Sequence, residues 1–313
     1  MIDENIKKRI KYTEEKIKAL RDRLSKTLKG SDFAVVTSGS FARGEASGQS
    51  DLDFFIICDD DNVKKELQHI FSKIQNCIQL LKLKAPADDG AFAETESIKS
   101  MVTNIGGQKD QNNKITRRIL FLLEGQWLFG PKQFESYRRK IVHRYIKQGI
   151  SDHQLSKFFL NDLIRYYRTM CVDFEYKTAE DGKPWGTRNL KLMFSRKLLY
   201  FSGIIVAAES AQRSYETKIN RTLELLSLTP IARIQEVCGS RADIALQMYG
   251  RFLKALSDPE VRKLTDAVTN NRDTHTQEFK ALKNEGHHFT WALAKLLKDT
   301  YDTGHPIHNA LIL

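Results

Sequence analysis

Two aspartates one residue apart, Asp51 and Asp53, stand just before an apolar run of strand length, residues 54–57. Side chains of a strand alternate between its two faces, so both carboxylates are expected on the same face. Magnesium prefers oxygen ligands, and proteins normally hold it with one or two carboxylates together with the phosphates of a nucleotide. The pair therefore predicts a Mg²⁺ site for a phosphate-bearing ligand.

A Gly-Ser turn, Gly39-Ser40, follows the predicted strand 33–37. Glycine allows a sharp backbone turn, after which main-chain N–H groups and the Ser40 hydroxyl can face phosphate oxygens. Residues 41–46 are expected to begin a helix, whose N-terminal end is partly positive and attracts anions. The sequence therefore predicts a phosphate-binding turn followed by a carboxylate-bearing strand.

Together, these residues resemble the signature of the DNA polymerase β nucleotidyltransferase superfamily. In this chain the signature consists of Gly39-Ser40 and Asp51-Leu52-Asp53, with Arg43-Gly44 and Ser50 as frequent additions. The resemblance implies an enzyme that uses Mg²⁺, with two ions, to move a nucleoside monophosphate from a nucleoside triphosphate (NTP) to an acceptor hydroxyl, releasing pyrophosphate. It also implies that Asp51 and Asp53 are catalytic metal ligands. The nucleotide-binding residues would be Gly39, Ser40, Arg43 and Ser50.

The superfamily usually adds a third catalytic carboxylate from a strand beside the aspartate pair. Glu94 is our first choice, because residues 91–94 could form such a strand, and Glu96 is the next choice on the same face. Asp88 and Asp89 are read first as turn residues. The third carboxylate would deprotonate the attacking hydroxyl, so catalysis depends on one of these side chains.

A basic cluster surrounds the loop at residues 181–186. Its members are Lys177, Lys183, Arg188, Lys191, Arg196 and Lys197. Arg188, Lys191 and Ser195 are three and four residues apart, so a regular helix would place them on one face. Helical-domain Lys, Arg and Ser residues contact the outer phosphates in several relatives, which implies nucleotide binding here. A solvated helix face is an equal alternative, and Arg165 with Arg168 is a second choice for the same role.

Two domains are expected from the pattern of elements. Apolar residues at helical spacing predict amphipathic helices at residues 1–30, 63–81, 113–127 and 132–147. A stop signal near 149–152 marks the boundary, and everything after it has a helical pattern. We expect an α+β protein: residues 1–149 form an α/β catalytic domain, for which the resemblance implies a small mixed sheet. Residues 150–313 form an all-helical domain, which the resemblance implies closes the nucleotide cleft.

The net charge of +11 predicts an anionic partner, which a nucleotide satisfies as well as RNA or DNA does. Four scattered cysteines without a Cys-x-x-Cys pair give no zinc or disulfide pattern. No apolar run is long enough to cross a membrane, and the first residues lack a signal-peptide profile. We therefore expect a cytoplasmic protein without a membrane partner.

The acceptor cannot be identified from the residues. The two-domain plan most resembles enzymes that modify a protein or a small molecule. A second-messenger synthase or an RNA-tailing enzyme comes next, and a catalytically dead nucleotide sensor is the alternative from another class. Arg138 and His143 have the Arg-x4-His spacing of HEPN ribonucleases, which is expected by chance in a basic chain.

Overall fold

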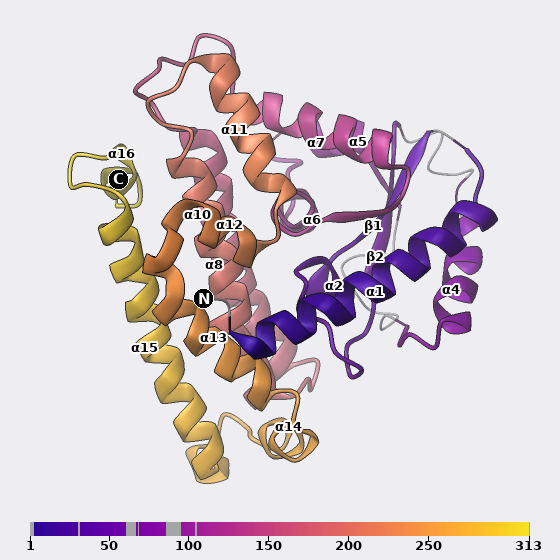
Figure 1. Ribbon diagram of the computed structural model, residues 1–313, viewed down its shortest axis with the longest axis vertical. Coiled ribbons are helices and arrows are strands. Elements are labelled where there is room, and N and C mark those ends of the chain that lie inside the picture. Colours follow the sequence, from indigo (N-terminus) through magenta and orange to yellow (C-terminus); the bar gives the residue numbers. More distant parts are fainter. Residues whose placement is uncertain are drawn as a thin grey trace. The chain divides into compact units, whose positions relative to one another are not determined.

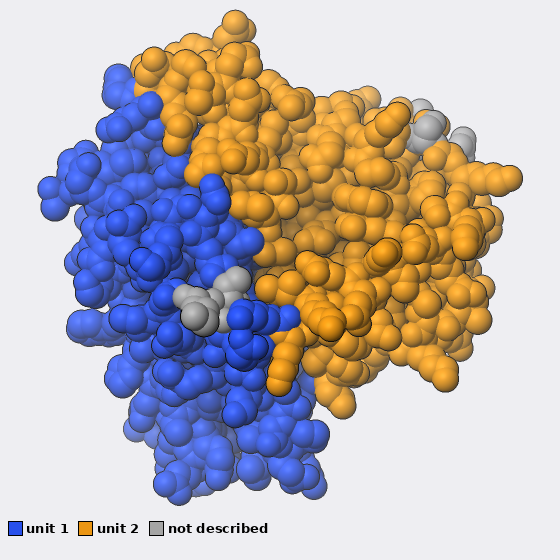
Figure 2. Space-filling view, in the orientation of Figure 1, with its two compact units in different colours: residues 1–7, 153–212, 230–313 blue, residues 8–152, 213–229 orange. Residues whose placement is uncertain are grey.

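The computed structural model describes residues 3–30, 32–60, 67, 69–85, 95–103 and 105–312. The chain divides into two compact units, coloured separately in Figure 2. Unit 1 comprises Met1–Lys7, His153–Gln212 and Pro230–Leu313, and unit 2 comprises Lys8–Asp152 and Arg213–Thr229. A single boundary near residue 149 was expected, whereas residues 213–229 return to the unit formed by the first half of the chain.

The described part of unit 2 is built on a four-stranded sheet in the order β3-β2-β1-β4. The strands are β1 (Phe33–Thr37), β2 (Phe54–Cys58), β3 (Glu96–Ser97) and β4 (Gln126–Phe129). β1 runs antiparallel to both β2 and β4, whereas β2 runs parallel to β3. The mixed sheet and the positions of β1 and β2 confirm the expectations from the sequence.

Helices cover both faces of this sheet (Figure 1). In its described residues, the helices of unit 2 are α1 (Glu4–Thr27, of which the residues up to Lys7 belong to unit 1), α2 (Gly39–Ala42), α4 (Ile70–Leu80), α5 (Ile98–Val102), α6 (Asn112–Leu123), α7 (Pro131–Tyr145) and α11 (Tyr215–Ser227). On one face, Phe54 and Ile56 share a buried core with residues of α1 and α4. On the other, Phe55 packs against Phe121 of α6, which contacts Phe134 of α7. Alternation along β2 therefore sends neighbouring side chains into two separate cores.

Two of the expected helices end earlier than the sequence suggested. The helix expected at 41–46 is one turn, α2, and the positive φ of Gly44 (+75°) turns the chain away directly afterwards. The helix expected to reach Trp127 ends at Leu123, and Trp127 lies in β4, paired with β1. A Cβ on Gly125 would lie 2.5 Å from the carbonyl oxygen of Phe121, so glycine permits this tight turn.

The regular secondary structure in the described residues of unit 1 is entirely helical, as expected. Its helices are α8 (Lys157–Ala179), α9 (Trp185–Lys191), the π-helix η1 (Leu192–Arg196), α10 (Lys197–Ala208), α12 (Pro230–Cys238), the 3₁₀-helix η2 (Gly239–Ala242), α13 (Asp243–Ala255), α14 (Pro259–Asp266), the 3₁₀-helix η3 (Arg272–Thr274), α15 (Gln277–Thr300) and α16 (Pro306–Ala310). Stacked rings of Phe194, Phe252 and Phe289 join η1, α13 and α15 at its centre. Within the described ranges, none of the helices is long and apolar enough to cross a bilayer.

Candidate active site

Gly39 and Asp53 come together at one end of the sheet. Gly39 has φ of +71°, and a Cβ built on it would lie 2.7 Å from Oδ2 of Asp53. The carboxylate of Asp53 therefore packs directly against the Cα of Gly39. This contact places the glycine of the predicted phosphate turn beside an aspartate of the predicted metal site, 14 residues further along the chain.

Backbone hydrogen bonds fix this arrangement. The carbonyl oxygen of Asp53 accepts hydrogen bonds from the Thr37 hydroxyl (2.8 Å) and from the Ser38 N–H (3.2 Å). They extend the antiparallel pairing of β1 and β2 past the last paired residues, Thr37 and Phe54. As a result, the chain segments before Gly39 and around Asp53 are held at a set distance, which pre-organises the turn relative to the carboxylate.

Asp51 lies two residues before Asp53, on the surface of the protein. It is exposed, and it forms an isolated parallel bridge with Lys84. The N–H of Leu52 donates to the carbonyl oxygen of Lys84 (2.9 Å), while the Leu52 side chain is buried. Burial of Leu52 anchors the segment between the aspartates, so that both neighbouring carboxylates are directed away from that core.

The pair fits a divalent cation by the chemistry of its donors. Both side chains supply carboxylate oxygens, Asp51 is exposed and Asp53 is half-buried, which leaves room for the waters and phosphates that Mg²⁺ retains. No group of three or more His, Cys, Asp or Glu side chains in the described residues is placed to hold a metal ion. Asp51 and Asp53 are the residues that would hold the ion here, through their carboxylate oxygens.

Ser40 and Ser50 occupy different environments. Ser40 is half-buried and is the second residue of α2. Ser50 instead accepts a hydrogen bond from the N–H of Ser47 (3.0 Å), which shapes the loop before Asp51. Ser40 is thus placed to contact a phosphate, whereas Ser50 supports the loop in this structure. Their roles in nucleotide binding remain predictions.

Arg43 is buried between two glutamates. Its Nε donates to Glu45 (2.8 Å), and its Nη1 donates to Glu124 (2.6 Å). An arginine held in this way orients the short helix α2 through its carboxylate partners, and both of its ion pairs are shielded from water. The predicted contact between Arg43 and the nucleotide is not tested by this geometry.

Glu124 is a site residue that the sequence reasoning missed. One carboxylate oxygen accepts from the N–H of Gly39 (2.9 Å), while the other pairs with Arg43. Glu124 lies just after the end of α6 and is buried. The only local signal is an acidic residue between an apolar helix and Gly125, and such a signal does not identify a partner in a distant turn.

The candidates for the third catalytic carboxylate are Glu94, Glu96, Asp88 and Asp89. Glu94 lies outside the described residues, as do Asp88 and Asp89. Glu96 is described: it pairs with Ile57 in β3 and forms a buried ion pair with Arg117 (2.7 Å). Since Ile57 is four residues beyond Asp53, Glu96 is roughly 13 Å further along the strand direction. The structure therefore does not bring Glu96 to the aspartate pair.

The predicted phosphate-binding residues of the helical half lie in unit 1. Arg188 and Lys191 belong to α9, but Ser195 lies in the π-helix η1 and is buried, accepting a hydrogen bond from Tyr249 (3.1 Å). A π-helix has more residues per turn than an α-helix, so the expected common face of these three residues is interrupted. Arg165 and Arg168 are the second choice for phosphate binding, and Arg165 forms an ion pair with Asp162 (2.6 Å). Nucleotide binding by these residues remains a prediction.

Arg138 and His143 do not form a joint site. Arg138 is buried over the ring of Phe134 and donates to the carbonyl oxygen of Gly125, and burial lowers the pKa of its guanidinium. His143 is exposed on the opposite side of α7, next to Tyr215. The two side chains therefore face different environments, which agrees with a chance occurrence of this spacing.

Comparison with known proteins bears on the same segment. Residues 17–88 match the family described as the nucleotidyltransferase domain. The matched segment contains the Gly39-Ser40 turn and both aspartates of the pair, so it confirms the resemblance to the DNA polymerase β-type superfamily. It supports a nucleotidyltransferase enzyme with a nucleotide substrate. No curated protein is similar enough to the chain to count as a match.

Proposed function

We propose that this protein is a Mg²⁺-dependent nucleotidyltransferase that moves a nucleoside monophosphate from an NTP to a hydroxyl of a protein or small molecule. The observation that carries the proposal is the contact between the Asp53 carboxylate and the backbone of Gly39. This contact joins the two halves of the predicted site. The nucleotidyltransferase-domain match at residues 17–88 supports the same reaction class.

Asp51 and Asp53 would hold the metal. Bound Mg²⁺ would neutralise charge on the phosphates and orient them for in-line displacement. Ser40 would donate its hydroxyl to a phosphate oxygen from the N-terminal end of α2. The protein's contribution is then mainly positioning and electrostatic stabilisation, in a turn that is already fixed before substrate binds.

The transfer exchanges one phosphorus–oxygen bond for another and needs no oxidant or reductant. The acceptor oxygen forms a bond to the α-phosphorus, the bond from that phosphorus to the pyrophosphate oxygen breaks, and the hydroxyl proton passes to a base. We propose Glu94 as this base. Its supporting argument is the resemblance, in which a third carboxylate beside the aspartate pair performs this step.

A label-transfer assay tests the proposal. Each NTP, labelled at the α-phosphate, is incubated with the protein, Mg²⁺ and cell lysate, and the protein, nucleic-acid and small-molecule fractions are separated. We expect label in the protein or small-molecule fraction. Asp53→Asn should reduce transfer about 100-fold or more, because it removes a charged metal ligand while keeping the side-chain shape.

The outcomes of the assay separate the alternatives. Transfer by Asp53→Asn at the wild-type rate, in a variant with an unchanged melting temperature, would overturn the assignment of this site. Label confined to RNA would replace the proposed acceptor class. NTP binding without transfer to any fraction would favour the nucleotide sensor, with Glu94→Gln then indistinguishable from wild type.

A further inference from the structure

A basic surface covers the outer side of α7. Arg139, Lys140, His143 and Arg144 are all exposed, whereas Phe134, Tyr137, Ile141 and Val142 are buried. Arg139 and His143 are four residues apart and share one side of the helix, as do Lys140 and Arg144, and the two sides adjoin each other. Cationic groups are therefore spread along more than one turn of a single surface, which we call the α7 basic face.

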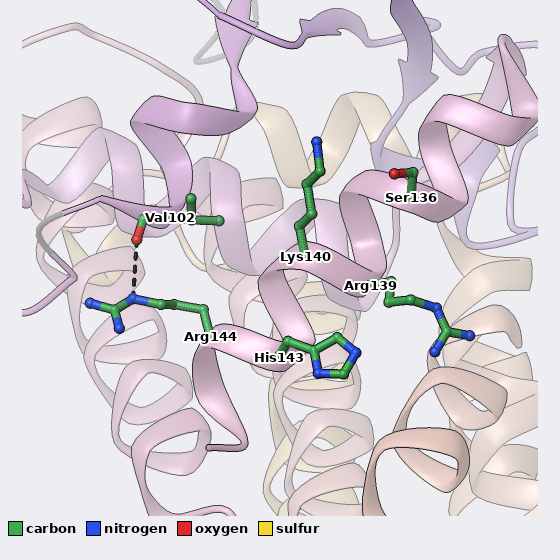
Figure 3. A pocket seen from close by; sticks show the side chains of 6 residues that line it. All are labelled: Val102, Ser136, Arg139, Lys140, His143 and Arg144. Atoms are coloured by element: carbon green, nitrogen blue, oxygen red, sulfur yellow. Dashed lines mark hydrogen bonds between the residues drawn. The ribbon is translucent and has the colours of Figure 1, made fainter. Parts of the chain in front are cut away.

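These side chains surround an open pocket. Val102 and Ser136 complete its lining, and the cavity has a volume of about 510 Å³. Figure 3 shows Lys140, Arg139 and Arg144 pointing in different directions from the helix, so their charged ends are spread apart. A single compact anion could not contact all three at once, whereas an extended anion could follow them.

Protein carboxylates neutralise this face only in part. Lys140 pairs with Asp59 at 3.5 Å, and both side chains are about half exposed, which makes the pair weak. Arg144 donates through Nε to the carbonyl oxygen of Val102 (3.2 Å), which leaves its terminal amino groups for another acceptor. Arg139 is exposed, and the neighbouring Glu135 pairs with Arg138.

We propose that the α7 basic face binds the phosphodiester backbone of a nucleic acid without reading its sequence. A polynucleotide presents regularly spaced negative charges, which matches cations distributed along a helix. The lining contains no Asn or Gln, the side chains that pair with adenine edges, and Arg and Lys also contact phosphates, which carry no sequence information. This surface shares no residue with the Gly39 and Asp53 site, and it is a binding function in addition to nucleotidyl transfer.

A membrane fits this surface less well. Peripheral membrane binding by a helix normally combines basic residues with exposed apolar side chains that enter the lipid. The large exposed hydrophobic residues in the described part of the chain are Leu80, Val172, Tyr176, Ile244, Leu264, Trp291 and Ile312. All of them lie outside α5 and α7, so the α7 basic face offers charge without an apolar anchor.

Fluorescence anisotropy over a range of KCl concentrations tests the inference. The probes are short labelled oligonucleotides: RNA and DNA of the same sequence, each single-stranded and as a duplex, without NTP or Mg²⁺. Three permanent cations predict a slope of log K against log salt concentration of about −2 for a single strand. Arg139→Gln with Lys140→Gln should reduce its magnitude by about 1.4, and weaken binding at least about 10-fold near 100 mM KCl.

Lys11→Gln with Lys18→Gln is the matched control, because it removes two exposed charges from another helix of the same unit. We expect this control to bind like wild type, and the comparison between RNA and DNA probes to identify the preferred polymer. Equal losses in both double variants would show that only net charge matters and would overturn the inference. A second result would also overturn the inference: the protein binds anionic phospholipid vesicles through Arg139 and Lys140 and binds none of the oligonucleotides.

Discussion

At the scale of single residues, Gly39 is under two separate constraints. Its φ of +71° lies in the left-handed region, and its Cα faces Oδ2 of Asp53 at a distance that leaves no room for a Cβ. A larger residue would be strained at its own backbone and would also push the carboxylate away. The glycine therefore contributes to the position of the aspartate as well as to the turn.

We predict that Gly39→Ala lowers the free energy of unfolding by about 1–3 kcal/mol, the usual cost of a non-glycine residue in a strained conformation. Nucleotidyl transfer should fall more steeply than stability, because the displaced carboxylate belongs to Asp53. Chemical denaturation and the label-transfer assay measure the two effects separately.

Gly48→Ala is the control for this substitution. A Cβ at Gly48 would have no atoms within 4 Å, and the residue does not have a positive φ. Its replacement should change stability by less than about 0.5 kcal/mol. If Gly39→Ala were as stable and as active as Gly48→Ala, the proposed contact with Asp53 would be wrong.

At the scale of elements, Glu124 connects the end of α6 to the start of α2. It accepts from the first N–H of α2, that of Gly39, and it pairs with Arg43 just beyond the end of that helix. A helix of one turn gains little stability from its own hydrogen bonds, so contacts of this kind must hold it. Glu124 thus links the end of α6 to the turn beside Asp53, so the position of α6 helps to set the position of that turn.

We predict that Glu124→Gln destabilises the protein by about 1–3 kcal/mol, because the buried charge on Arg43 loses a carboxylate partner. The glutamine amide can still accept from Gly39 through its oxygen, but its NH₂ group would face the guanidinium donors. Urea denaturation measures the loss, and the transfer assay measures its effect on the site.

Glu135→Gln provides the comparison on a neighbouring element. Glu135 also pairs with an arginine, Arg138, but its side chain is 58 % exposed. Exposed pairs contribute little, so we expect a change below about 1 kcal/mol. Equal destabilisation by the two substitutions would show that burial does not increase the contribution of the Glu124–Arg43 ion pair to stability.

At the scale of the whole molecule, the chain leaves unit 2 after Asp152 and returns to it at Arg213. The carbonyl oxygen of Asp152 accepts from the Arg213 N–H (3.0 Å) and from Nζ of Lys218 (2.7 Å). On the unit 1 side, Ser156 and Ser210 are hydrogen-bonded to each other. The departing and returning segments are therefore tied together within each unit.

We predict that Lys218→Ala loosens residues 213–229 relative to the rest of unit 2. Lys218 is fully buried, burial lowers its pKa, and its ammonium group donates to the carbonyl oxygen of Asp152. Hydrogen exchange in α11 should accelerate, with a local loss of about 1–3 kcal/mol. Asn220→Ala, an exposed position on the same helix, should leave exchange unchanged. Uniform acceleration across the protein would contradict a local role.

Short-range patterns in the sequence determined the parts of the site that lie close together along the chain. Strands β1 and β2, the Gly39-Ser40 turn and the position of Asp51 and Asp53 before β2 followed from local apolar runs, turn residues and period-two alternation. These features depend on backbone conformation and on side-chain direction within a few residues. They are also the part of the chain that the nucleotidyltransferase-domain match contains.

Which distant groups support that site follows from packing in three dimensions and not from local sequence patterns. Glu124 reaches Gly39 because α6 packs on the face of the sheet that carries Phe55, and Trp127 extends into β4 because β1 offers an unpaired edge. The return of α11 to unit 2 likewise depends on contacts with Asp152. Such pairings are selected by packing and by the need to satisfy buried charges and N–H groups, and neither leaves a periodic signal in the sequence.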